Sequence, residues 1–443
     1  MNIASKIPIE VLGEVFLHAI DGSISNVQDN GFPWAINRVC KYWRSAFVTS
    51  PDLWTWITIN LAESYSRGQD FNAANQCLSL CLERSRNYPL NISLHLPNEG
   101  YDENSPSVTP IWQTFLSCSH RWRIVHLENV LGPQLLTINL CTGATPILES
   151  LTIYSPVDPD NYNDFTGFQI VPHLTRFTLV HPTAMFAVRT WSVPWMQLTN
   201  LMLRFNEIGG VDQLCVLFQQ LRDIEELCLS LGGDEGEIEL GDFVHNSGTP
   251  QCLQHLRVLQ VCCVEIFGLI TAPSLYELYL EGSRFFYSKT GDGDPYEILP
   301  EAIISSFIQR SGCKIHKLTL SDFSAPPFTP LVQLFPDVVE LCLVDAVTCL
   351  RHLIEPNQFP GLRALDCTTH TINATFFMGI LLLILQVHNT SSAKCSAASL
   401  EKVIFRPVLE DGEPSVLVST TDWASFETYV KIGSWCVHSI LTD

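Results

Sequence analysis

The chain repeats one short pattern of apolar and polar positions, apolar-x-x-apolar-x-apolar, along most of its length. The last two apolar positions of each copy alternate with polar ones, which is the period of a half-buried β-strand. The pattern therefore predicts a series of strands, each burying one face. The middle apolar positions of the copies are Val125, Leu151, Phe177, Leu201, Leu227, Leu259, Leu278, Leu318, Leu341, Leu365 and Val403.

The spacing of these copies resembles that of leucine-rich repeats. Most neighbouring copies are about 20 to 29 residues apart, as in that family. The resemblance implies parallel strands stacked in a solenoid, because one repeat cannot bury its apolar triplet alone. It is loose within each repeat, since the asparagine expected after the third apolar position occurs only at Asn206. The longer spacings predict inserted loops at residues 231–249, 284–299 and 380–399.

The first sixty residues follow a helical period instead. Apolar residues recur there three or four positions apart, which predicts helical segments at residues 8–19, 33–49 and 52–57. A polar, glycine-containing interval at residues 21–31 separates the first two segments. A unit this small buries only about 60% of its chain surface, so we expect part of its apolar surface to contact a partner or the rest of the chain.

Three motifs in these segments resemble the F-box. They are Ile-Pro-Ile-Glu-Val-Leu at residues 7–12, Val-Cys-Lys-Tyr-Trp at residues 39–43 and Ser-Pro-Asp-Leu-Trp at residues 50–54. Their order and spacing agree with that family. Ile7 replaces the usual leucine, and the interval between the first two helices is long, as in the F-box-like proteins of mushroom-forming fungi.

The resemblance implies that the N-terminal helices bind the Skp-type adaptor of a cullin ubiquitin ligase. Periodicity alone leaves open an alternative, a three-helix unit that merely caps the repeat body. Carried over position by position, the expected adaptor-binding residues are Pro8, Ile9, Leu12, Val15, Phe16, Val39, Cys40, Trp43, Leu53 and Trp54.

These patterns predict an α/β fold with an N-terminal three-helix F-box and an irregular leucine-rich-repeat-like solenoid containing a parallel sheet. The apolar run at residues 376–387 is shorter than the roughly 20 residues that span a bilayer, so we expect a buried helix there. Apolar residues at helical spacing in residues 423–430 predict a closing helix. The expected domains are an F-box-like domain at 1–60, a connector with the first repeat at 61–120, the solenoid at 121–410 and a C-terminal cap at 411–443.

The net charge and the cysteine spacing restrict which partners and which cellular compartment we expect. The chain has 46 acidic residues against 25 lysines and arginines, a formal charge of −21, which repels nucleic acid. The N-terminus has no apolar run of the secretory type, so we expect neither secretion nor membrane insertion. The 16 cysteines are scattered and form no C-x-x-C pair, which is typical of reduced thiols in the cytoplasm or nucleus.

Motifs that carry chemistry are missing from the sequence. G-x-S-x-G, H-E-x-x-H, the P-loop and G-x-G-x-x-G do not occur. The acidic, glycine-rich segments at 232–237 and 291–294 lack the register of a calcium loop and are expected to be solvated loops. Cys77 and Cys81 lie one helical turn apart, where core packing is expected. We therefore predict no enzyme activity, no cofactor and no metal site.

We expect the polar positions of the repeated pattern to point out of the sheet and to form a surface that binds a protein substrate. The alternative is that this face of the sheet is only solvated and binds no partner. The expected function is that of a substrate-recognition subunit of a Skp-cullin-F-box type ubiquitin ligase. The alternatives are a non-catalytic leucine-rich-repeat scaffold with no ligase link, or an enzyme on an irregular repeat body, which the missing motifs disfavour. The candidate substrate-binding residues are Tyr154, Arg176, Arg204, Tyr279 and Lys317.

Overall fold

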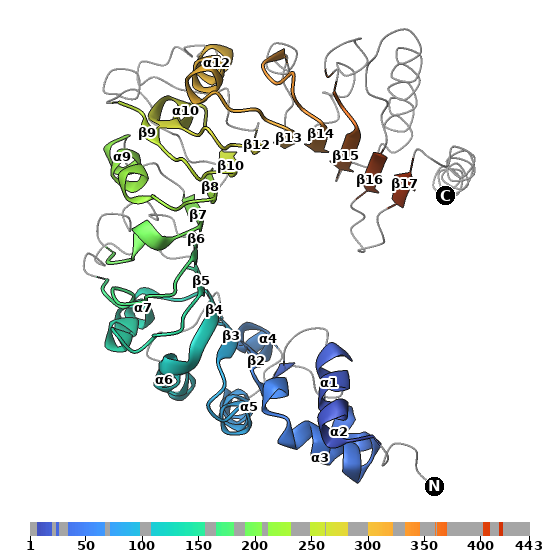
Figure 1. Ribbon diagram of the computed structural model, residues 1–443. Helices are drawn as coiled ribbons and strands as arrows, with labels where there is room; N and C mark the ends of the chain where they lie inside the picture. Colours follow the sequence, from blue (N-terminus) through green and yellow to red (C-terminus); the bar gives the residue numbers. More distant parts are fainter. Residues whose placement is uncertain are drawn as a thin grey trace. The chain divides into compact units, whose positions relative to one another are not determined.

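The computed structural model is a mixed α/β protein with a large parallel β-sheet (Figure 1). The chain divides into two compact units, unit 1 (Met1–Leu221 and Leu231–Gly236) and unit 2 (Arg222–Ser230 and Glu237–Asp443). The structure describes residues 7–19, 24–25, 34–66, 71–97, 108–155, 165–180, 191–205, 211–231, 249–261, 263–281, 300–321, 333–345, 359, 361–369, 402–407 and 416–419. Asn206, most of the predicted insertions, and the helices predicted at 376–387 and 423–430 lie outside these residues.

Unit 1 begins with a group of short helices: α1 (Ile9–Ala19), α2 (Ile36–Val39), α3 (Lys41–Thr49) and the 3-10 helix η2 (Pro51–Trp54). Helix α1 packs against α3, where the ring centroids of Phe16 and Trp43 are 5.2 Å apart. The predicted second helix is broken at Cys40, whose backbone is extended and whose Sγ accepts a hydrogen bond from the Trp43 N–H. Cys40 thus caps α3, a change of backbone conformation that apolar periodicity does not detect.

The predicted third helical segment also ends early. The 3-10 helix stops at Trp54, and Trp56 begins a strand. Because Ile57 and Ile59 alternate with Trp56 and Thr58, this stretch buries one strand face.

The strands of unit 1 lie in the sheet in the order of the sequence, and each adjacent pair is parallel. Their register places the middle apolar positions side by side, with Leu151 opposite Val125 on one neighbour and Phe177 on the other. The strands are β1 (Ile24–Ser25), β2 (Trp56–Asn60), β3 (Leu90–His95), β4 (Trp122–Glu128), β5 (Ser150–Tyr154), β6 (Arg176–Val180) and β7 (Asn200–Phe205).

Helices connect these strands, and α5, α6 and α7 lie along one side of the unit 1 sheet (Figure 1). Buried Arg121 holds the C-terminal end of α5 by donating hydrogen bonds to the Tyr88 carbonyl at 3.0 Å and to Ser85 Oγ at 2.6 Å. The helices are α4 (Leu61–Ser66), α5 (Phe71–Arg84), α6 (Thr109–Ser117), α7 (Gly132–Ile138) and α9 (Val211–Gln220), with 3-10 helices η3 (Ser119–Arg121), η4 (Asn139–Cys141) and η5 (Trp195–Gln197).

Unit 2 repeats the arrangement of parallel strands in sequence order: β8 (Glu226–Leu231), β10 (Val258–Val261), β12 (Glu277–Glu281), β13 (Lys317–Ser321), β14 (Glu340–Val344), β15 (Ala364–Thr369) and β16 (Lys402–Pro407). The last strand, β17 (Val416–Ser419), is antiparallel to β16. A separate two-stranded sheet joins β9 (Gln251–Cys252) to β11 (Ile270–Thr271). The helices described in this unit are α10 (Ile266–Leu269) and α12 (Pro300–Ser311).

The core of each unit consists of the apolar positions that the repeated pattern selects. Of the eleven middle positions, all except Val403, whose side chain lies outside the described set, are buried. Larger side chains from the connecting helices fill the space behind the strands, as where Phe115 of α6 stacks on Trp122 at 4.4 Å between ring centroids. Among the helices that the structure describes, none has the length and apolar character needed to cross a membrane.

Candidate protein-binding surfaces

The N-terminal helices expose an apolar stripe. On α1, Val11 is 48% exposed and Val15 is 52% exposed. Exposed Pro8 lies one helical turn before Val11, and Val15 lies one turn after it. On α2, Val39 is 57% exposed. Aliphatic side chains with this much exposure are available to a partner.

The ten residues expected to bind an adaptor fall into three groups by exposure. Buried members serve the core of the helical group, so their side chains are not available on this surface without rearrangement. Pro8, Val15 and Val39 are exposed, Ile9, Cys40 and Trp43 are half-buried, and Leu12, Phe16, Leu53 and Trp54 are buried.

Trp54 shows what the buried members do. Its indole N–H donates to the Phe47 carbonyl at 2.9 Å, and its ring lies 4.7 Å from that of Phe47. The guanidinium of Arg84, on α5, lies 4.3 Å from the Trp54 ring centroid, a cation–π contact. Trp54 therefore joins the N-terminal helices to the body of unit 1.

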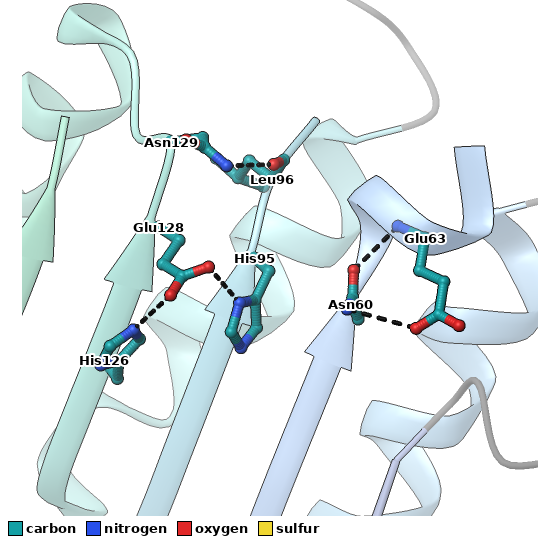
Figure 2. Close-up of polar contacts among 7 residues, drawn as sticks. All are labelled: Asn60, Glu63, His95, Leu96, His126, Glu128 and Asn129. Atoms are coloured by element: carbon teal, nitrogen blue, oxygen red, sulfur yellow. Dashed lines mark hydrogen bonds and ion pairs between the residues drawn. The ribbon is translucent and has the colours of Figure 1, made fainter. Parts of the chain in front are cut away.

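The outward face of the unit 1 sheet carries a hydrogen-bonded cluster on β3 and β4. Figure 2 shows the Glu128 carboxylate between two imidazole rings: one oxygen is bonded to His95 Nδ1, and the other lies 2.9 Å from His126 Nε2. The His126 ring also packs against Tyr154 of β5, with centroids 5.3 Å apart. The cluster thus extends across three neighbouring strands.

The two histidines change the acidity of Glu128. Partial burial disfavours the charged carboxylate, but hydrogen bonds from His126 and His95 and the charges of both rings outweigh that effect, so the pKa of Glu128 lies below its usual 4.5. Both oxygens of this carboxylate are thus hydrogen-bonded to histidine rings of the same protein.

Of the candidate substrate-binding residues, three lie on the unit 1 sheet. Tyr154 ends β5, Arg176 begins β6, and Arg204 lies on β7 opposite Val180. Both arginine side chains are exposed, and neither side chain forms a hydrogen bond or ion pair with another described residue, whereas the Arg176 backbone N–H donates to the Glu149 carbonyl at 3.1 Å.

The other two candidates lie on the unit 2 sheet, in a different electrostatic setting. Lys317 of β13 forms an ion pair of 2.5 Å with Glu277 of β12. Partial burial lowers the pKa of Lys317, but the hydrogen bond to Glu277 and the nearby charge of Glu340 reverse this, so the net shift is upward. Tyr279 is half-buried two residues after Glu277. The Lys317 charge is therefore already balanced by a neighbouring carboxylate.

Sequence reasoning missed the histidine–carboxylate cluster. The alternation of His126 and Glu128 with Val125 and Leu127 was sufficient to place both on the outward face. It gave no means of placing His95 beside them, because that contact depends on the register between β3 and β4, in which His95 is opposite Glu128. Within the described ranges, no group of three or more His, Cys, Asp or Glu side chains has an arrangement that would hold a metal ion.

Comparison of the chain with protein-family models and with curated proteins gave no match.

Proposed function

We propose that the chain is a non-catalytic substrate-recognition subunit of a Skp-cullin-F-box type ubiquitin ligase. In this role the N-terminal helices are an F-box that binds the Skp-type adaptor, and the strands form a leucine-rich-repeat-like solenoid that binds a protein substrate. The role belongs to the cytoplasm or nucleus.

One observation carries the adaptor half of the proposal. The motif-bearing helices pack through Leu12, Phe16 and Trp54 while Val15 and Val39 remain exposed. A small helical group that leaves aliphatic side chains in solvent has the character of a docking surface.

The order of the strands supports the repeat half. Successive strands are parallel and hydrogen-bonded in sequence order, and each adds one set of inward apolar positions in register with the next, as with Leu318, Leu341 and Leu365. Stacking of similar units that bury a shared apolar core is the principle of repeat proteins.

The mechanism is proximity. A chain that binds the ligase through one surface and a substrate through another raises the effective concentration of substrate lysines near the charged ubiquitin. The side chains of this protein then need to bind and orient, and the bond-making steps belong to other subunits.

The test is a binding measurement between the purified full chain and a Skp-type adaptor. The variant carries Val15→Glu and Val39→Glu, two substitutions at exposed helical positions that place charge in the proposed interface without disturbing the core. We expect a loss of binding of at least about 100-fold, because two carboxylates would be buried without partners. Buried Leu12 is unsuitable, since its substitution would alter stability and binding together.

Leu140→Glu is the matched control. Leu140 is an aliphatic side chain with 82% exposure that lies outside the N-terminal helices, so this variant should bind the adaptor as the wild type does. Failure of the well-folded wild type to bind any Skp-type adaptor would overturn the proposal.

A second candidate is a repeat scaffold without a ligase link. The Arg84–Trp54 contact and the pairing of β1 with β2 favour it, because both fasten the N-terminal helices to the body as a cap would be fastened. The adaptor measurement separates the two candidates.

A further inference from the structure

The outward positions of β5, β6 and β7 form a surface of one charge sign, here named the arginine face. Its arginines and Met202 are exposed, and the other members are half-buried. The arginine face consists of Tyr154, Arg176, Thr178, Val180, Met202 and Arg204.

No described outward position of these three strands carries an acidic side chain, although acidic residues outnumber basic ones in the chain. The whole sequence has 46 acidic residues against 25 lysines and arginines. The carboxylate on the neighbouring strand β4, Glu128, is held by His95 and His126. Exposed Glu149 precedes β5, and its backbone carbonyl accepts a hydrogen bond from the Arg176 N–H at 3.1 Å, so this acidic residue borders the face.

The corresponding positions of unit 2 carry glutamates on three strands and the basic residues Lys402 and Arg406 on β16. Its strands begin with Glu226 on β8, Glu277 on β12 and Glu340 on β14, and Lys317 between the last two is paired with Glu277. Among the outward strand positions whose side chains the structure describes, exposed arginines occur on β6 and β7.

The spacing of the two arginines suits an extended chain. Arg176 lies opposite Asn200, and Arg204 is on the same strand as Asn200 and four residues further along. With about 3.3 Å per residue and about 4.8 Å between strands, the two Cα atoms are about 14 Å apart. Two residues four positions apart in an extended peptide are separated by about 13 Å and point to the same side.

We propose that the arginine face binds an acidic segment of the protein substrate in an extended conformation. Two carboxylates four residues apart contact Arg176 and Arg204, whose planar guanidinium groups suit carboxylate oxygens. Met202 and Val180 contact the aliphatic side chain between them. The inference rests on the proposed function, since it gives the chemistry of the substrate that such a subunit recruits.

The experiment measures fluorescence anisotropy of a rhodamine-labelled peptide, Gly-Thr-Glu-Thr-Val-Thr-Glu-Thr-Gly, with the purified full chain. A matched peptide has glutamine at both glutamate positions. We expect the glutamate peptide to bind about three- to thirtyfold more tightly, as two exposed ion pairs allow, and the preference to weaken with added salt.

Three variants locate the preference. Arg176→Gln with Arg204→Gln should abolish it, and both side chains are exposed, so the fold is retained. Lys314→Gln removes an exposed cation that precedes β13 in unit 2 and should leave the preference unchanged. Glu149→Gln should increase affinity slightly, because it removes a repelling charge near the face.

Three results would overturn the inference: equal affinity for the two peptides, a preference that survives the double arginine variant, or no binding of the glutamate peptide at about 1 mM. Adaptor binding measured on the same preparation distinguishes this failure from failure of the proposed function. Adaptor binding without peptide preference rejects the acidic substrate alone, whereas peptide preference without adaptor binding supports the arginine face and rejects the ligase role.

Discussion

Glu128 shows how neighbouring strands tune a single side chain. The carboxylate is partly exposed, yet both of its oxygens are bonded to histidine rings from β3 and β4 (Figure 2). Because its pKa lies below the usual 4.5, the folded state binds a proton at Glu128 less readily than the unfolded state does. The hydrogen bonds to Glu128 therefore stabilise the folded state at pH values above 4.5, and this stabilisation is lost as the pH falls through the lowered pKa of Glu128.

A pH series of urea unfolding tests this linkage. Between near-neutral pH and the acid range below 4.5, the wild type should lose more free energy of unfolding than Glu128→Gln does, because the variant lacks the titrating carboxylate. At near-neutral pH the variant should be the less stable of the two. Parallel stability curves for the two proteins would contradict the assignment.

Among the helices and strands, caps and strand alternation determine where each element begins and which face it buries. Asn60 ends β2 and caps α4: its Oδ1 accepts the Glu63 backbone N–H at 2.8 Å and its Nδ2 lies 3.4 Å from Glu63 Oε2 (Figure 2). Asn129 follows the last residue of β4 and has a positive φ of 58°. Its Nδ2 donates a hydrogen bond to the Leu96 carbonyl at 2.9 Å.

The two faces of β5 should differ sharply in their sensitivity to truncation. Leu151 is fully buried and Thr152 beside it points outward. Leu151→Ala should cost about 2–5 kcal/mol of unfolding free energy through lost burial and the cavity that it leaves. Thr152→Ala should change it by less than about 1 kcal/mol, as expected of a partly exposed position.

Urea unfolding of the two variants, followed by circular dichroism, checks this difference. The loss of unfolding free energy in Leu151→Ala should be seen in the unfolding transition of unit 1. Equal effects from Leu151→Ala and Thr152→Ala would mean that the strand buries neither face preferentially and would contradict the register of β5 with β4 and β6.

For the whole molecule, net charge and thiol chemistry are the properties that matter. The net charge of −21 disfavours the binding of other acidic chains, and the exposed arginines of β6 and β7 are a local departure from it. The cysteines that the structure describes are all free. Burial raises the pKa of the Cys118 thiol to about 11, which keeps it protonated and unreactive near neutral pH.

Thiol titration without reductant tests this property of the molecule. In denaturant, all 16 cysteines should react with a thiol reagent. In the native protein, exposed Cys252 should react ahead of buried Cys118 and Cys141. A reductant should move the melting temperature by less than about 1 °C, since none of the described cysteines forms a disulfide that would constrain the unfolded chain. Fewer reactive thiols in denaturant would reveal disulfides and contradict the expected reducing compartment.

Local patterns in the sequence predicted most of the strands and their buried faces. Leu151 and Ile153 alternate with outward residues, and this period of two depends on backbone geometry within one strand. The same reasoning placed Tyr154, Arg176 and Arg204 on the outward face. Helical spacing predicted α1 and α3, although it did not detect the extended residue at Cys40 that separates α2 from α3.

The tertiary structure decided which residues meet and which are hidden. Leu12 and Val15 share one apolar pattern in the sequence, but α3 covers one side of α1, so Leu12 is buried and Val15 is exposed. His95 reaches Glu128 because strands 33 residues apart in the chain are paired in a particular register. Periodicity reports which way a side chain faces along its own element, whereas its neighbours depend on contacts between distant segments, which no local pattern contains.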